Sequence, residues 1–304
     1  MRGSITKRLS AALALGLGVL LFQNCSAVKF ETVTGKKPVV ATGLPDDKDP
    51  TDDPPDTEKP PELCAGVSCD LTPLTSKPAV TTILMALGDA ADDQLVVNGA
   101  SAQFIAESVV RYTSHKTNPK ILVVVDHSTH DEDPEDTQYV IDVLLKRYDV
   151  TFLQEDATGL TPELLAGFDI VWFNNPGHPM SSQATRDALL GFAGGIVLQG
   201  DDLSQGAGFS MESLTGLKAI NNGNVVVCNG NSYTHDNNGG SKFSVSLNAQ
   251  KIPGANASQL SFEYGNDIDL TEVVRSDLEV LATAVGGGPD CTEERPAIVR
   301  YIKN

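Results

Sequence analysis

Two hydrophobic periodicities alternate along residues 77–304, and this alternation constrains the fold more than any other feature of the sequence. Short apolar, β-branched runs predict strands, and several are continuously apolar, as in strands covered on both faces. The predicted strands are 81–87, 121–126, 150–153, 170–174, 195–199 and 224–228; stretches with helical spacing or capping signals are 104–112, 134–145, 161–165, 181–192 and 210–217. The alternation predicts one α/β domain with an open, doubly wound, mostly parallel sheet of flavodoxin-like type.

The first 24 residues have the organisation of a lipoprotein signal peptide. Basic residues precede the apolar run 11–22, which is too short to cross a bilayer as a helix. The run ends in Leu-Leu-Phe-Gln-Asn-Cys, which resembles a bacterial lipobox and makes Cys25 the predicted site of lipidation. The expected protein is therefore attached to a membrane of the bacterial cell envelope.

Two residues of this motif depart from the usual lipobox pattern. Phe22 and Asn24 stand where leucine and a small residue are usual, so ordinary cleavage after Ala27 remains an alternative. That cleavage would release a soluble periplasmic or secreted protein. The residue after Cys25 is Ser26 and not aspartate, which by resemblance to the lipoprotein sorting rule favours the outer membrane.

Residues 25–76 are predicted to be an acidic, proline-rich stalk. Between Pro45 and Pro61 the sequence has no apolar residue other than proline, so it has nothing with which to build a core. The repeated aspartates suggest a calcium-binding loop, but the segment lacks the glycine and the closing glutamate of an EF-hand. Proline stiffness and charge repulsion are expected to keep the segment extended.

Four cysteines remain if Cys25 carries lipid. An even number in an exported protein favours disulfides, and we predict the pairs Cys64–Cys69 and Cys228–Cys291. Other pairings and free buried thiols remain open. A four-thiolate zinc site is disfavoured because the paired Cys-x-x-Cys spacing is missing.

The formal net charge of −18 excludes one class of partner. A protein this acidic is repelled by phosphate backbones, so nucleic-acid binding is not expected. A solvated acidic surface accounts for the charge.

Polar residues follow several of the predicted strands. In an open parallel sheet, ligands bind beyond the carboxyl ends of the strands, so these residues are the candidates for a ligand or metal site. They are Asp126, His127, Asn174, Asn175, His178, Asp201, Asp202 and His235. Loops are polar in any protein, and the Asn-Asn-Pro-Gly stretch also fits a simple turn.

The order of these segments resembles a known family. Residues 148–202, "YDVTFLQEDATGLTPELLAGFDIVWFNNPGHPMSSQATRDALLGFAGGIVLQGDD", look like the ThuA-like (trehalose-utilisation) branch of the class I glutamine amidotransferase-like superfamily. The segments "FEYGNDIDL", "LEVLATA" and "ERPAIVRYIKN" look like that group's closing strands. The resemblance covers roughly residues 120–303 and implies the fold much more than an activity.

The residues expected of a glutaminase are missing. Such an enzyme needs a cysteine in a sharp strand-to-helix turn, and the corresponding place reads Gln199-Gly200-Asp201. No Gly-x-Ser-x-Gly motif offers a serine nucleophile instead. Glutaminase activity is therefore not expected.

Three functions remain open, and whether the protein is an enzyme is one of the open points. The favoured one is binding of a small polar or carbohydrate ligand by the strand-end residues, with Trp172 as a further candidate that core packing explains better. The second is a metal-assisted hydrolase with Asp126, His127, His178, Asp201 and His235 as ligands of a divalent ion. The third is an envelope scaffold without a ligand site. No dinucleotide or P-loop motif is present, so no cofactor is required, although a divalent metal fits the second hypothesis.

Overall fold

A computed structural model describes residues 71–88, 99–125, 134–154, 158–174, 182–200, 212–219, 225–228, 231–234, 242–265, 268, 271–288 and 291–304. The chain divides into two units, residues 1–38 and 39–304, and all described residues belong to the second unit. The signal peptide (1–24), Cys25, the Cys64–Cys69 pair and most of the stalk (25–76) lie outside the described residues. These assignments therefore stay predictions.

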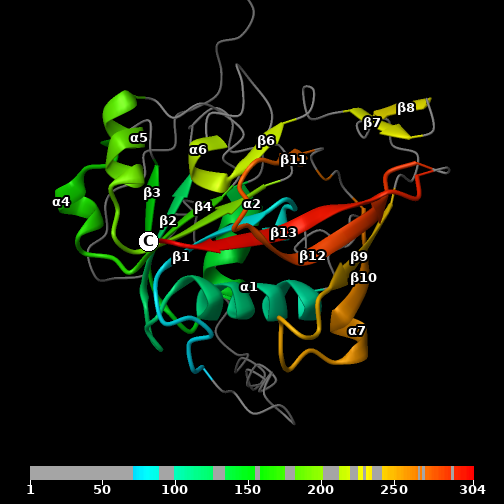
Figure 1. Cartoon of the computed structure of the whole chain (residues 1–304). Coiled ribbons are helices and arrows are strands. Elements are labelled where there is room, and N and C mark those ends of the chain that lie inside the picture. The colour runs from blue at the N-terminus through cyan, green and yellow to red at the C-terminus, as the bar shows by residue number, and fades with distance from the viewer. Residues whose placement is uncertain are drawn as a thin grey trace, which may run out of the picture. The chain divides into compact units, whose positions relative to one another are not determined.

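The described part of the chain is an α/β structure built on one mixed sheet of nine strands, in the order β10-β9-β12-β13-β1-β5-β4-β2-β3 (Figure 1). Its strands are β1 (Ala79–Ile83), β2 (Lys120–Val125), β3 (Asp149–Gln154), β4 (Ile170–Asn174), β5 (Gly195–Gln199), β9 (Phe243–Leu247), β10 (Ser261–Tyr264), β12 (Glu279–Gly286) and β13 (Glu294–Ile302). The five strands at one end of this order, β1-β5-β4-β2-β3, pair in parallel. At the other end, β10-β9-β12-β13-β1, all neighbours pair antiparallel.

Five of the six strands predicted from the sequence belong to the parallel part, although the first lies at Ala79–Ile83 and not at 81–87. The sixth prediction, 224–228, is wrong about its partner. β7 (Val225–Cys228) pairs with β8 (Asn231–Thr234) in a separate two-stranded antiparallel sheet. Only two residues separate β7 from β8, a connection that allows a hairpin, whereas a parallel neighbour needs a crossover of a dozen residues or more. A further pair joins β6 (Leu217–Ala219) to β11 (Thr271–Val273).

Two helices, α4 and α5, begin where the capping signals place them, whereas α1 begins five residues before the predicted stretch 104–112. Thr161 caps α4 (Pro162–Leu165) by accepting from the Leu164 N–H at 3.2 Å, and Ser182 caps α5 (Gln183–Leu190) in the same way. α5 ends two residues before the predicted end at 192. The other helices are α1 (Gly99–Thr113), α2 (Pro134–Tyr139), α6 (Glu212–Thr215) and α7 (Ala257–Leu260). The last turn after α2 is a π-helix, η2 (Val140–Leu144).

Apolar side chains cover both faces of the parallel strands. On one face, α1 and η2 pack against residues that include Ile83, Ile121, Trp172 and Val197. On the other face, α4, α5 and α6 contribute Leu165, Leu189 and Leu214 to a second cluster with alternate residues of the same strands. Figure 1 shows α1 on one side of the sheet and α6 on the other. Burial on both faces explains why the strand sequences are continuously apolar.

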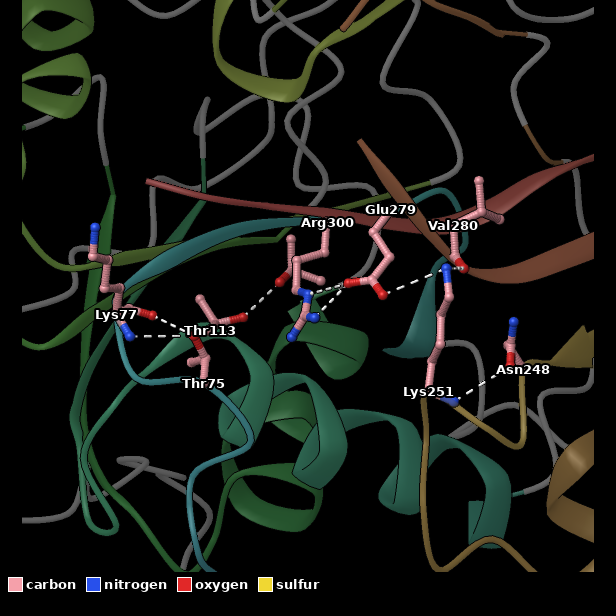
Figure 2. Close-up of polar contacts among 9 residues, drawn as sticks. Thr75, Lys77, Thr113, Asn248, Lys251, Glu279, Val280 and Arg300 are labelled. Atoms are coloured by element: carbon pink, nitrogen blue, oxygen red, sulfur yellow. Dashed lines mark hydrogen bonds and ion pairs between the residues drawn. The ribbon is translucent and has the colours of Figure 1, made fainter. Parts of the chain in front are cut away.

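A polar network joins the antiparallel strands to the α1 face of the sheet (Figure 2). Arg300 on β13 donates from Nε to Glu279 on β12 at 3.0 Å, and its guanidinium lies 4.4 Å from the ring centre of Tyr112 on α1. Lys251 lies 3.4 Å from the second carboxylate oxygen of Glu279. Desolvation raises the pKa of Glu279, but the hydrogen bond and charge of Arg300, together with Lys251, outweigh it, so the pKa lies below its usual value.

Candidate functional site

The parallel strands end at one level. Val125, Asn174, Gln199 and Ile83 are the last residues of β2, β4, β5 and β1, and each is paired in register with the next. Carboxyl ends of parallel strands share one edge of a sheet, which is where ligands bind in this class of structure. The edge of the sheet at which the site is predicted therefore lies within the described residues.

A chain of buried hydrogen bonds lies at this edge, between β4 and β5. The Trp172 indole donates from Nε1 to Gln199 Oε1 at 3.1 Å. Gln199 Nε2 donates to Asn174 Oδ1 at 2.8 Å, and Asn174 Nδ2 donates to Thr137 Oγ1 at 2.9 Å. None of the four residues is more than 5% exposed. We call Trp172, Gln199, Asn174 and Thr137 the amide chain.

The fold of α2 brings Thr137 to the strand ends. At Gly88, beyond β1, an added Cβ atom would lie 2.6 Å from Asp136 Cβ, so the first turn of α2 rests directly on this backbone. Two residues before Gly88, the Ala86 N–H donates to the Tyr264 hydroxyl at 2.9 Å. The helix that carries Thr137 is thus held between the extension of β1 and the end of β4.

The amide chain is chemically neutral. Two carboxamides, one hydroxyl and one indole offer hydrogen-bond donors and acceptors, and none of these groups is charged near neutral pH. Such an arrangement suits recognition of hydroxyl or carbonyl oxygens. It holds no charged group that could act as a general base.

Of the eight candidate ligand or metal residues, Asn174 is the one that the structure describes. It is 5% exposed and lies at the predicted edge, at the end of β4. The others lie outside the described residues: Asp126, His127, Asn175, His178, Asp201, Asp202 and His235. Whether they approach one another therefore stays a prediction.

Sequence reasoning missed Gln199 and Thr137. A signal for Gln199 was present, because β4 and β5 are apolar strands that both end in a carboxamide residue. Thr137 had no such signal, since it lies within α2 and not at the end of a strand, and only the packing of α2 brings it to the site. Trp172, interpreted from the sequence as a core residue, is fully buried and also starts the amide chain.

The described residues contain neither a cluster of metal ligands nor a membrane-spanning helix. Within these residues, no group of three or more His, Cys, Asp and Glu side chains could hold a metal ion. All five predicted metal ligands lie outside that part of the chain. None of the described helices is long and apolar enough to cross a membrane.

Cys291 is buried and disulfide-bonded. The side chain of its predicted partner, Cys228, lies outside the described residues. The pairing Cys228–Cys291 therefore stays a prediction.

Comparisons with known proteins identified no relative: no family model, no curated protein and no solved structure matches the chain. The resemblance to the ThuA-like group thus has no support from these comparisons. What the structure itself establishes is an α/β class with a mixed nine-stranded sheet that is parallel in its core.

Proposed function

We propose that this protein binds a small neutral, oxygen-rich ligand, such as a carbohydrate, at the carboxyl edge of its parallel strands. The observation that carries the proposal is the pair of carboxamides, Asn174 and Gln199, buried in register at the ends of neighbouring strands. Buried polar side chains at the ligand-binding edge of an α/β sheet are typical of sites that fix the orientation of a ligand. The sequence adds Asp126 and Asn175 directly after two of these strand ends.

The finer fold assignment is part of the proposal. Leaving β1 aside, the strands β2 to β5, numbered one to four along the chain, stand in the order 2-1-3-4. These are the first four places of the flavodoxin-like order 2-1-3-4-5, and β1 takes the fifth place, parallel to β5. This order supports a doubly wound, amidotransferase-like domain in which β1, the first of the described strands, takes the place of the usual last strand. We propose that the domain has no glutaminase function.

We further propose that this domain, from residue 77 onward, is carried on the stalk 25–76 and attached through Cys25 to the outer membrane. A lipid-anchored binding domain on an extended linker can reach ligands at a distance from the membrane surface. The proposal rests on the signal-peptide pattern, and the partners it names are the membrane and a small ligand.

The binding proposal is tested on the full chain, purified in a detergent without a sugar headgroup. Thermal unfolding is measured with D-glucose as the first neutral probe and with divalent ions in parallel. D-glucose is expected to raise the melting temperature, since a ligand at about 100 times its Kd stabilises the folded state by about 2.7 kcal/mol. Asn174→Leu should remove the effect, whereas the control Asn118→Leu, at an exposed turn before β2, should retain it.

The other hypotheses make different predictions in the same experiment. A metal-assisted hydrolase should carry a stoichiometric metal by elemental analysis and be stabilised by divalent ions. A scaffold should respond to neither probe. Either result, without stabilisation by D-glucose or other neutral sugars, refutes the binding proposal.

A further inference from the structure

The direction of the amide chain is fixed at one end. An indole nitrogen can only donate a hydrogen bond, so the Gln199 atom that faces Trp172 must be the oxygen Oε1. The nitrogen of Gln199 then faces Asn174 and donates to its oxygen Oδ1. Asn174 in turn directs its nitrogen to Thr137. Each carboxamide could otherwise adopt either of two orientations, and Trp172 selects one for both.

With this orientation, one hydrogen of the Asn174 carboxamide has no partner among the described residues. The Nδ2 atom carries two hydrogens, of which one is donated to Thr137; among the described residues, the second has no acceptor. An orphaned buried N–H is rarer in proteins than a carbonyl oxygen with a spare lone pair. Asn174 therefore has one N–H for which the described part of the chain provides no acceptor.

We propose that Gln199 is a positioning residue of the ligand site, which holds Asn174 so that it offers an N–H to an acceptor oxygen of the ligand. Gln199 acts through Asn174 and need not touch the ligand. The ligand class is a neutral molecule with a hydroxyl or carbonyl oxygen. The ligand part of this inference rests on the proposed function, whereas the orientation of Asn174 does not.

Gln199→Glu tests the orientation, because it changes the direction of the chain with protonation. A carboxylate at position 199 accepts from Trp172 and can also only accept from Asn174, so the Asn174 amide must turn round. When the introduced carboxyl group is protonated, it accepts from Trp172 and donates to Asn174, as glutamine does. Burial at a site that is 1% exposed in the native protein favours the protonated form as the pH is lowered.

The affinity for D-glucose is therefore measured across pH for Gln199→Glu and for the exposed control Gln250→Glu, each relative to the unaltered protein. Gln199→Glu is expected to bind about five- to tenfold more weakly at high pH, the factor for one hydrogen bond, and to recover as the pH falls. Gln250→Glu should follow the unaltered protein throughout. Equal relative affinities of the two variants at every pH overturn the inference.

A second measurement needs no ligand. Trp172 is the one tryptophan of the chain, so its ¹⁵N-labelled indole N–H gives a single peak in a ¹H–¹⁵N NMR spectrum. Gln199→Met keeps the side-chain length and removes the acceptor, and it should shift this peak upfield. Asn174→Leu should shift it less, through Gln199, and Gln250→Met should leave it in place. An unmoved peak in both site variants overturns the orientation argument even if a variant is less stable.

The two measurements separate the two proposals. If the unaltered protein does not bind D-glucose or other neutral sugars, the proposed function and the ligand role of Gln199 fail together, and the indole peak alone decides the orientation. If the protein binds D-glucose and Gln199→Glu behaves as Gln250→Glu does, the proposed function stands and the role of Gln199 is refuted.

Discussion

Replacing Gly195 with alanine tests how closely α1 packs on the sheet. Gly195 opens β5, and a Cβ atom there would lie 2.5 Å from the Thr113 carbonyl oxygen and 2.6 Å from Thr113 Cγ2. Both distances are far below normal contact, and Thr113 is fully buried. Its hydroxyl also shares a 2.7 Å hydrogen bond with Thr81 on β1. The end of α1 must therefore move to accept the methyl group.

The expected loss follows from two opposing effects. Overpacking of a well-packed core destabilises by about 1 to 3 kcal/mol. The loss of glycine's freedom in the unfolded chain offsets about 0.4 to 1 kcal/mol of this. We expect a net loss of about 1.3 kcal/mol in the free energy of unfolding. With a urea m-value of about 2 kcal/mol per molar, the unfolding midpoint falls by about 0.7 M.

Urea unfolding followed by circular dichroism measures this shift, with Gly167→Ala as the matched control. At Gly167 the nearest atom to an added Cβ is the Leu164 carbonyl oxygen at 3.4 Å, an ordinary contact, so the change should stay within about 0.5 kcal/mol. Adding Thr113→Ser to Gly195→Ala should recover part of the loss, because it removes Cγ2 and keeps the hydroxyl. If Gly195→Ala unfolds at the same urea concentration as Gly167→Ala, the close contact does not exist in solution.

Three further predictions concern other parts of the chain. Because the pKa of Glu279 is lowered in the folded protein, its contribution to stability is present above the ordinary glutamate pKa and is lost as the pH falls through the lowered value. The urea midpoint should therefore fall less steeply from about pH 7 to about pH 3 for Glu279→Gln than for the unaltered protein. Parallel curves for the two proteins contradict this prediction. Ser182→Ala removes the cap of α5 and should lower the free energy of unfolding by about 1 kcal/mol in urea, whereas an unchanged midpoint would show that the cap is not needed. Cys25→Ser should abolish fatty-acid labelling and membrane association in cell fractionation, and retention of both refutes the lipid anchor.

Much of the local structure was predictable from the sequence, because its causes lie within a few neighbouring residues. The apolar runs at 121–126 and 170–174 became β2 and β4, and their continuous apolarity reflects burial on both faces. Thr161 and Ser182 cap helices because a side-chain oxygen at the first position can reach a backbone N–H three residues on. The stretch 134–145 was found as helical, but its π-helical end was not, since hydrophobic spacing does not distinguish one extra residue in a turn.

The candidate site was predictable in part. Asn174 was identified because a polar residue ended an apolar strand, and it lies at the carboxyl end of β4. Its partners Gln199 and Thr137 are 25 and 37 residues away along the chain. No pattern in a single sequence specifies such contacts, because they depend on which strands become neighbours.

The sequence by itself determined that this chain alternates strands and helices, where several of them begin, and which strand ends carry polar side chains. Tertiary structure alone decided that β1 lies beside β5, that β7 turns back on β8, and that Trp172 sets the direction of hydrogen bonds reaching Asn174. The physical reason is the distance along the chain over which each kind of interaction acts. Periodicity and capping act over one or two turns of chain, whereas strand order and a buried hydrogen-bond chain are chosen by the packing of the whole sheet.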